Sequence, residues 1–121
     1  MGAFFLQRIN DHLQYLRKID ATLSGRGDFR GGDHHACKLG QWIDSVGPRE
    51  AAAFGPAAVA ALEGVHHPHE LFHAASGRAL ALKESGEHEA CEREVTLMHQ
   101  LSRELVDLLL GLDRIAQSGK A

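Results

Sequence analysis

The last third of the chain carries apolar residues at alternating steps of three and four positions, from Cys91 to Ile115. This spacing places the apolar side chains on one face of an α-helix, which turns once every 3.6 residues. The pattern predicts the longest helix of the chain, from Glu87 to about Gln117. A helix with one apolar face has to bury that face against other elements, so the segment indicates a helical bundle.

Shorter segments with helical patterns precede this one. We predict them at residues 3–24, 36–44, 56–64 and 68–84, separated by turns that contain Gly or Pro. Residues 24–35 hold four glycines and indicate a flexible connection, in which Asp33 is the expected N-cap of a short helix that Gly47-Pro48 ends. The sequence therefore predicts an all-α fold, a four-helix bundle with an additional short helix that carries a cysteine motif.

Composition excludes several classes of protein. The 121 residues are expected to form a single domain over 1–121, since 44% hydrophobic and 24% charged residues are typical of a globular chain. A net charge of −3 provides no basic patch for nucleic acid. The apolar runs are too short to cross a bilayer and no signal peptide is apparent, so a cytoplasmic location is expected. The two cysteines, Cys37 and Cys91, are expected to be thiols in that compartment.

Histidines interrupt two of the apolar stripes. His12 lies in the middle of the first stripe, and His69 and His73 lie on the inward face of the helix predicted at 68–84. Side chains four residues apart share a helix face with Cβ atoms about 6 Å apart, so His69 and His73 can chelate one metal ion. For His12 two interpretations remain open, a metal ligand and a core histidine whose nitrogens have hydrogen-bond partners.

Other histidines fit a metal site less well. Four of them occur as adjacent pairs beside Gly, Asp or Pro and are expected to be exposed loop residues: His34-His35 and His66-His67. His88 and Cys91 lie three residues apart and form a weaker rival metal pair, while Cys91 is more simply explained as a core residue.

Cys37 completes a candidate metal site. One thiolate and three imidazoles, from Cys37, His12, His69 and His73, are a ligand set suited to tetrahedral Zn²⁺. Four protein ligands leave no open position for water, which favours a structural or sensing role over hydrolysis, and no enzymatic activity is expected. A nearby carboxylate would offset the remaining positive charge, and Asp11 and Glu70 are the nearest in sequence.

Two residues of the short helix are expected to support this site. Gly40 costs about 1 kcal/mol relative to Ala in a helix interior, which suggests that another backbone or a metal-bearing side chain comes close to it. Trp42, the only tryptophan, is expected to anchor the short helix in the core.

These residues form motifs that can be compared with known families. Asp11-His12 with Tyr15, the run Cys37-Lys38-Leu39-Gly40-Gln41-Trp42, and Pro68-His69 followed by His73 resemble the chemoreceptor zinc-binding (CZB) domain family. That family carries Asp-His-x-x-Trp, Cys-x-Leu-Gly-x-Trp and Pro-His-x-x-x-His elements in this order. The resemblance spans about residues 5–112, and it departs from the family pattern at Tyr15, where a Trp is usual.

The resemblance implies both the ligands and the role of the domain. It implies that His12, Cys37, His69 and His73 bind zinc, in a four-helix bundle that often forms a homodimer. It also implies regulation of a bacterial signalling output, such as a chemoreceptor or a diguanylate cyclase that makes cyclic-di-GMP. The chain carries no output domain, so a separate partner or a longer parent protein is expected.

We expect Cys37 to be the redox switch of such a sensor. It lies on a short segment between the glycine-rich connection and Gly47-Pro48, and a thiolate is open to oxidation. The signal is then an oxidant or the zinc level itself. Two alternatives are a hemerythrin-like di-iron oxygen carrier, which needs more inward His-x-x-x-His pairs, and a purely structural helical module.

Overall fold

The computed structural model describes residues 4–118, which form six α-helices and no β-strand. Three helices are long and make up the body of the bundle: α1 (Phe4–Leu23), α5 (His66–Glu84) and α6 (His88–Ser118). Three short helices lie between α1 and α5 in sequence: α2 (Lys38–Ile43), α3 (Gly47–Ala52) and α4 (Pro56–Glu63). The predicted all-α bundle is confirmed.

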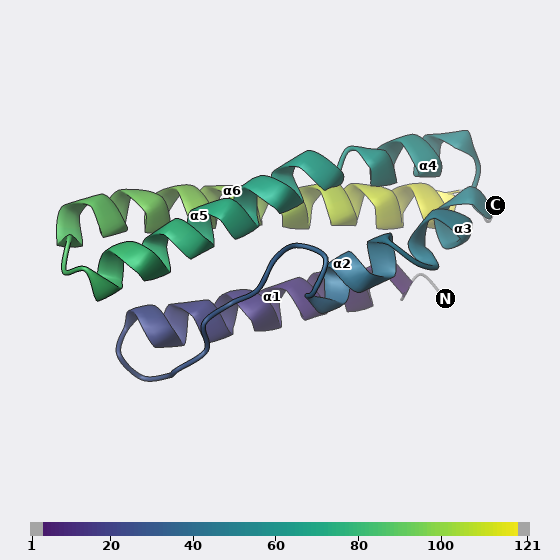
Figure 1. Cartoon of the computed structure of the whole chain (residues 1–121). Helices are drawn as coiled ribbons and strands as arrows, with labels where there is room; N and C mark the ends of the chain where they lie inside the picture. The colour runs from purple at the N-terminus through teal and green to yellow at the C-terminus, as the bar shows by residue number, and fades with distance from the viewer. Residues whose placement is uncertain (1–3, 119–121) are drawn as a thin grey trace.

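The long helix α6 is the shared packing partner of α1, α4 and α5. It packs along α5, to which a short turn joins it, and it also contacts α1 and α4 (Figure 1). After α1 the chain returns beside that helix as an extended loop and then enters α2 (Figure 1). Because of this return, α2 lies against α1, and the start of α2 comes close to α5.

Two boundaries differ from the sequence-based prediction. Gly47-Pro48 begins the helix α3 and does not simply end α2, because a proline in the first helical turn loses no intrahelical hydrogen bond. Helix α5 begins at His66, two residues before the predicted start, so His66 and His67 lie in its first turn. Both of these side chains are exposed, although neither belongs to a loop.

The core follows the predicted apolar stripes. Helix α6 buries one face along its length, and α1 and α5 add aromatic and aliphatic side chains to the same cluster; among its members are Phe5, Ile19, Phe72, Met98, Leu105, Leu109 and Leu112. Three imidazoles lie within this apolar environment, from His12, His69 and His73, each less than one-tenth exposed. None of the helices in residues 4–118 has the length and apolar character needed to span a membrane.

Candidate metal centre

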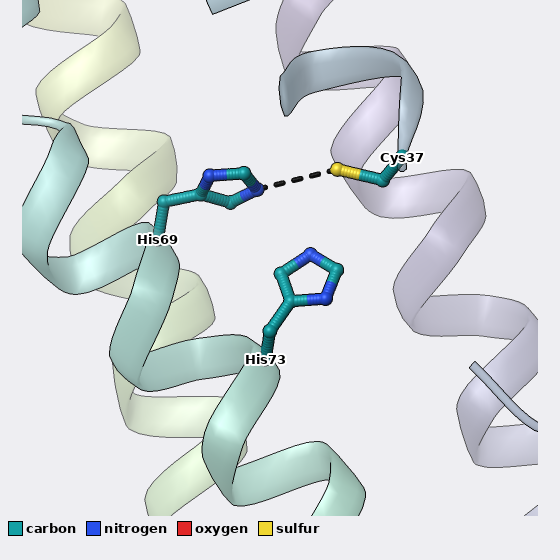
Figure 2. A group of neighbouring side chains, drawn as sticks. All are labelled: Cys37, His69 and His73. Atoms are coloured by element: carbon teal, nitrogen blue, oxygen red, sulfur yellow. Dashed lines mark hydrogen bonds between the residues drawn. The ribbon is translucent and has the colours of Figure 1, made fainter. Parts of the chain in front are cut away.

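A cysteine and two histidines converge where the start of α2 meets α5. Cys37, His69 and His73 each offer a ligand atom, and these atoms all lie within 4.8 Å of one another. The Cys37 Sγ atom lies 3.3 Å from His69 Nε2, and His73 points into the space beside that pair (Figure 2). The two histidines share one face of α5, as their four-residue spacing predicts, while Cys37 comes from the loop that returns along α1.

The loop before α2 fixes the position of Cys37. Cys37 is the N-cap of α2, and its Sγ accepts a hydrogen bond from the Gly40 backbone N–H at 3.3 Å. The prediction that Asp33 caps this helix is wrong, because the Asp33 carboxylate instead accepts from the backbone N–H groups of His35 and Ala36. Asp33 thus closes the turn before the helix, and the sulfur is held at the helix start.

Gly40 is required by a close approach of two backbones. A Cβ atom at this position would overlap the carbonyl oxygen of His34, so the loop crosses directly over the first turn of α2. The expectation that Gly40 admits a neighbouring backbone is therefore confirmed. Without this approach, the turn from His34 to Cys37 would stand away from α5.

His73 is oriented by a backbone carbonyl. Its Nδ1 lies 2.8 Å from the Gly32 carbonyl oxygen and donates to it, which leaves the Nε2 lone pair free. Nε2 is the ring nitrogen that points between Cys37 and His69 (Figure 2). The Tyr15 hydroxyl donates to the same Gly32 carbonyl at 3.1 Å and accepts from the Gly32 N–H at 2.9 Å. Tyr15 therefore holds the loop that orients His73, as is usual for groups behind a metal ligand.

His12 stands apart from this group. It is 3% exposed, and its Nε2 lies 2.8 Å from the Ser102 hydroxyl of α6. Its ring packs edge-on against Phe72, with the centroids 4.7 Å apart. The hydrogen bond to Ser102 leaves Nδ1 as the nitrogen able to bind a metal, so the predicted ligand role of His12 stays a prediction. Sequence analysis missed Ser102 as a partner, although a serine in the apolar stripe of α6 was the available signal.

Burial keeps the imidazoles neutral. Desolvation, with a contribution from His73, lowers the pKa of His12 from 6.5 to about 4. Desolvation and the neighbouring histidines lower the pKa of His69 to about 3, and desolvation also lowers the pKa of His73. Neutral imidazoles have the free lone pairs that metal ions need.

Burial shifts the pKa of the Cys37 thiol upward, whereas it shifts the pKa values of the histidines downward. Burial raises the pKa of Cys37, although backbone N–H groups such as that of Gly40 oppose the shift. The metal-free protein therefore carries a protonated thiol at neutral pH, and a metal that binds there has to displace this proton.

The buried histidines make the stability of the metal-free domain depend on pH. The pKa values of His12 and His69 are lower in the folded than in the unfolded chain, so the unfolded chain binds more protons below about pH 6.5. The free energy of unfolding is therefore highest above about pH 6.5, and it decreases as the pH falls below that value. At pH 5, His12 and His69 are each expected to lower the free energy of unfolding by about 2 kcal/mol relative to its value at neutral pH. Urea unfolding at pH 7.5 and pH 5 in a chelator measures the difference.

A matched pair of variants tests the assignment. His12→Gln should reduce the loss of stability between these two pH values by about 2 kcal/mol, because Gln does not titrate. His67→Gln should leave the loss unchanged, because His67 is exposed on α5. Equal stability of the wild type at both pH values would contradict the assignment.

The structure shows the contacts of two further residues expected beside the site. Asp11 is buried and pairs with Arg8 at 3.4 Å, and its charge adds to the rise in the pKa of Cys37. Trp42 is buried, as expected of a core anchor, and its indole N–H donates to Glu50 at 2.8 Å. The Trp42 ring also packs edge-on against Phe5, with the centroids 5.8 Å apart.

Sequence analysis overlooked an enzyme motif around the histidine pair. Residues 69–73 spell His-Glu-x-x-His, the pattern in which zinc peptidases use the glutamate as a general base. The pattern therefore does not itself argue against catalysis. In the structure Glu70 is exposed, whereas His69 and His73 are buried, and the Cys37 sulfur is a third possible ligand beside the two histidines.

The loop histidines divide into two kinds. His35 is exposed, as expected, and its Nδ1 pairs with Asp44 Oδ2 at 2.7 Å. The expectation that His34 is an exposed loop residue is wrong: it is half-buried, and its ring centroid lies 5.8 Å from that of His69.

The rival pair of His88 and Cys91 belongs to no group of three or more possible metal ligands within residues 4–118. The Cys91 thiol instead donates a hydrogen bond to the Ala79 carbonyl.

The sequence matches a known family model. The family model described as the chemoreceptor zinc-binding domain matches residues 12–80, more than half of the chain. No curated protein and no solved structure matches. The matched segment begins at His12 and includes Cys37, His69 and His73, and one thiol with neutral imidazoles is a donor set that fits zinc. The chain therefore belongs to the chemoreceptor zinc-binding domain family.

Proposed function

We propose that this chain is a regulatory domain that binds one Zn²⁺ through His12, Cys37, His69 and His73 and passes its state to a bacterial signalling partner. The buried group of Cys37, His69 and His73 inside the segment that matches the family carries the proposal. The partner would be a chemoreceptor or a diguanylate cyclase type of protein. The domain would act in the cytoplasm, as a homodimer and without enzymatic activity.

His12 is the fourth ligand in this proposal. Its ring is buried and packs edge-on against Phe72, which fixes its place in the core. Ser102 occupies its Nε2, so a metal at Nδ1 would satisfy the other nitrogen and Ser102 would orient the ring. The ligands would then come from α1, from the start of α2 and from α5, and zinc would tie these three elements together.

Cys37 is the switch in this proposal. When bound, zinc would keep the Cys37 sulfur as a thiolate at neutral pH. A surface pocket of about 250 Å³ reaches Cys37, and Lys18 and Lys38 line it together with Tyr15. A small oxidant such as hypochlorous acid can enter and transfer its oxygen to the sulfur, which forms a sulfenic acid and releases chloride. The oxidised sulfur binds a metal poorly, so the start of α2 would lose its tie to α5.

Trp42 offers an intrinsic probe for this change. It is the only tryptophan of the chain, and it lies on α2, five residues after Cys37. In the zinc-loaded wild type, about one equivalent of hypochlorous acid is expected to change the Trp42 fluorescence. Cys37→Ser should abolish this change, whereas Cys91→Ser should retain it, because Cys91 lies on α6 away from the metal group. An undiminished response of Cys37→Ser would contradict the switch.

Metal analysis separates this proposal from its alternatives. Protein purified without chelator is expected to contain about one zinc per chain. Two irons per chain would instead indicate the di-iron oxygen carrier, although the group of Cys37, His69 and His73 includes no carboxylate to bridge two irons. Absence of metal would indicate a purely structural helical module.

A further inference from the structure

His34 approaches the metal group from the loop side. Its ring centroid lies 5.8 Å from that of His69 and 6.4 Å from that of His73, and the latter two centroids are 4.8 Å apart. We propose that His34 is a reserve zinc ligand, which takes the coordination position of the Cys37 sulfur when that sulfur leaves the metal. This inference rests on the proposed zinc function.

The spacing of the three rings is close to that of imidazoles on one zinc ion. A Zn–N bond of about 2.0–2.1 Å puts each ring centroid ~3.2 Å from the metal, and a tetrahedral angle then separates two centroids by about 5 Å. The distances from His34 to His69 and His73 exceed this value by only about 1 Å. A rotation of the His34 side chain can cover that difference without a change in the path of the loop.

The backbone of His34 is held while its ring remains available. The His34 carbonyl lies against Gly40 and accepts a long hydrogen bond from the Cys37 thiol at 3.8 Å. The ring stacks at a tilt on that of His35, with the centroids 4.1 Å apart, and His35 is in turn paired with Asp44. Within residues 4–118, the ring nitrogens of His34 make no hydrogen bond that metal binding would break.

The order of preference between the two ligands follows from charge. The thiolate of Cys37 brings a full negative charge to a divalent ion, whereas an imidazole ligand brings none, so Cys37 excludes His34 from the fourth position while the sulfur is intact. Once the sulfur leaves, His34 is the half-buried imidazole three residues away in the same turn. Zinc would then be retained by imidazoles alone. Two molecules of a thiol reductant, which become a disulfide and release water, could return the sulfenic acid to the thiol without a new metal ion.

A double-mutant cycle tests this exchange. Zinc affinity would be measured by competition with a chromophoric chelator in the wild type, His34→Gln, Cys37→Ser and the double variant. His34→Gln alone is expected to change the Kd by less than about threefold, and the same substitution in Cys37→Ser should weaken binding by a further tenfold or more, about the cost of losing a supporting ligand. His67→Gln, at an exposed position of α5, serves as the control in both backgrounds.

A direct measurement of the His34 ring gives an answer that does not depend on whether the double variant folds. In the Cys37→Ser protein, zinc should shift the ¹⁵N resonances of the His34 ring nitrogens, whereas in the wild type they should remain those of an unbound imidazole. Equal affinities of Cys37→Ser and the double variant, or unshifted His34 resonances in zinc-loaded Cys37→Ser, would overturn the reserve role alone. Failure of the wild type to bind zinc would overturn the proposed function as well.

Discussion

Replacement of both α5 histidines, His69→Ala with His73→Ala, is expected to abolish zinc binding at any concentration that a cell maintains. Zinc sites with four protein ligands contribute about 10–16 kcal/mol, so the loss of two ligands should cost about 5–8 kcal/mol, roughly 10⁴-fold or more in Kd. The pair also forms the chelate on one helix face, and His34 can replace one missing ligand but not two. Competition with a chromophoric chelator measures the change.

The same helix provides a matched control. His66 and His67 are a second histidine pair on α5, and both are exposed in its first turn. His66→Ala with His67→Ala removes the same chemical groups at the surface and should leave the Kd within a factor of about two. Circular dichroism of both double variants verifies that the helices remain. Retention of tight zinc binding without His69 and His73 would refute the assigned site.

Gly40→Ala is expected to have the second largest effect, although it adds a single methyl group. The new Cβ would overlap the His34 carbonyl oxygen, and a backbone atom cannot rotate away as a side chain can. The loop from His34 to Cys37 would have to lift from α2, which moves the sulfur away from the α5 histidines. We expect a loss of about 3 kcal/mol in the free energy of unfolding and at least tenfold weaker zinc binding.

Gly77→Ala is the control for this substitution. Gly77 lies on α5, and a Cβ added there would meet nothing within 4 Å. Alanine has a higher helix propensity, so Gly77→Ala should stabilise the protein by about 1 kcal/mol and leave zinc binding unchanged. Chemical unfolding together with zinc titration of both variants gives the comparison. A Gly40→Ala protein as stable as the wild type would show that the loop does not need this contact.

Periodicity predicted the parts of the site that belong to long helices. The inward faces of α1 and α5 follow from the three- and four-residue spacing of their apolar residues, and this spacing placed His12, His69 and His73 in the core. The motif around Cys37 added the sulfur. The family and the all-α fold could therefore be predicted before any coordinates, since they depend on local patterns.

The residues that were missed depend on the path of the loop. Residues between α1 and α2 have no periodicity, so nothing in the sequence showed that His34 is half-buried beside His69. The same limit applies to Gly32, whose contact with His73 joins positions far apart in the chain. Helix α3 was missed for a different reason: Gly-Pro is a common helix end, but a proline is equally suited to a first helical turn.

The backbone of Gly32 has a consequence for how the domain would respond to systematic mutagenesis. The Gly32 carbonyl accepts hydrogen bonds from His73 and from Tyr15, and the Gly32 N–H, which belongs to the preceding peptide group, donates to Tyr15. An alanine scan would not detect that role, because replacing Gly32 removes neither backbone group, and an added Cβ would only reach ordinary contact with Ala36. Backbone chemistry, such as an amide-to-ester exchange that deletes the N–H, would be needed to reveal it.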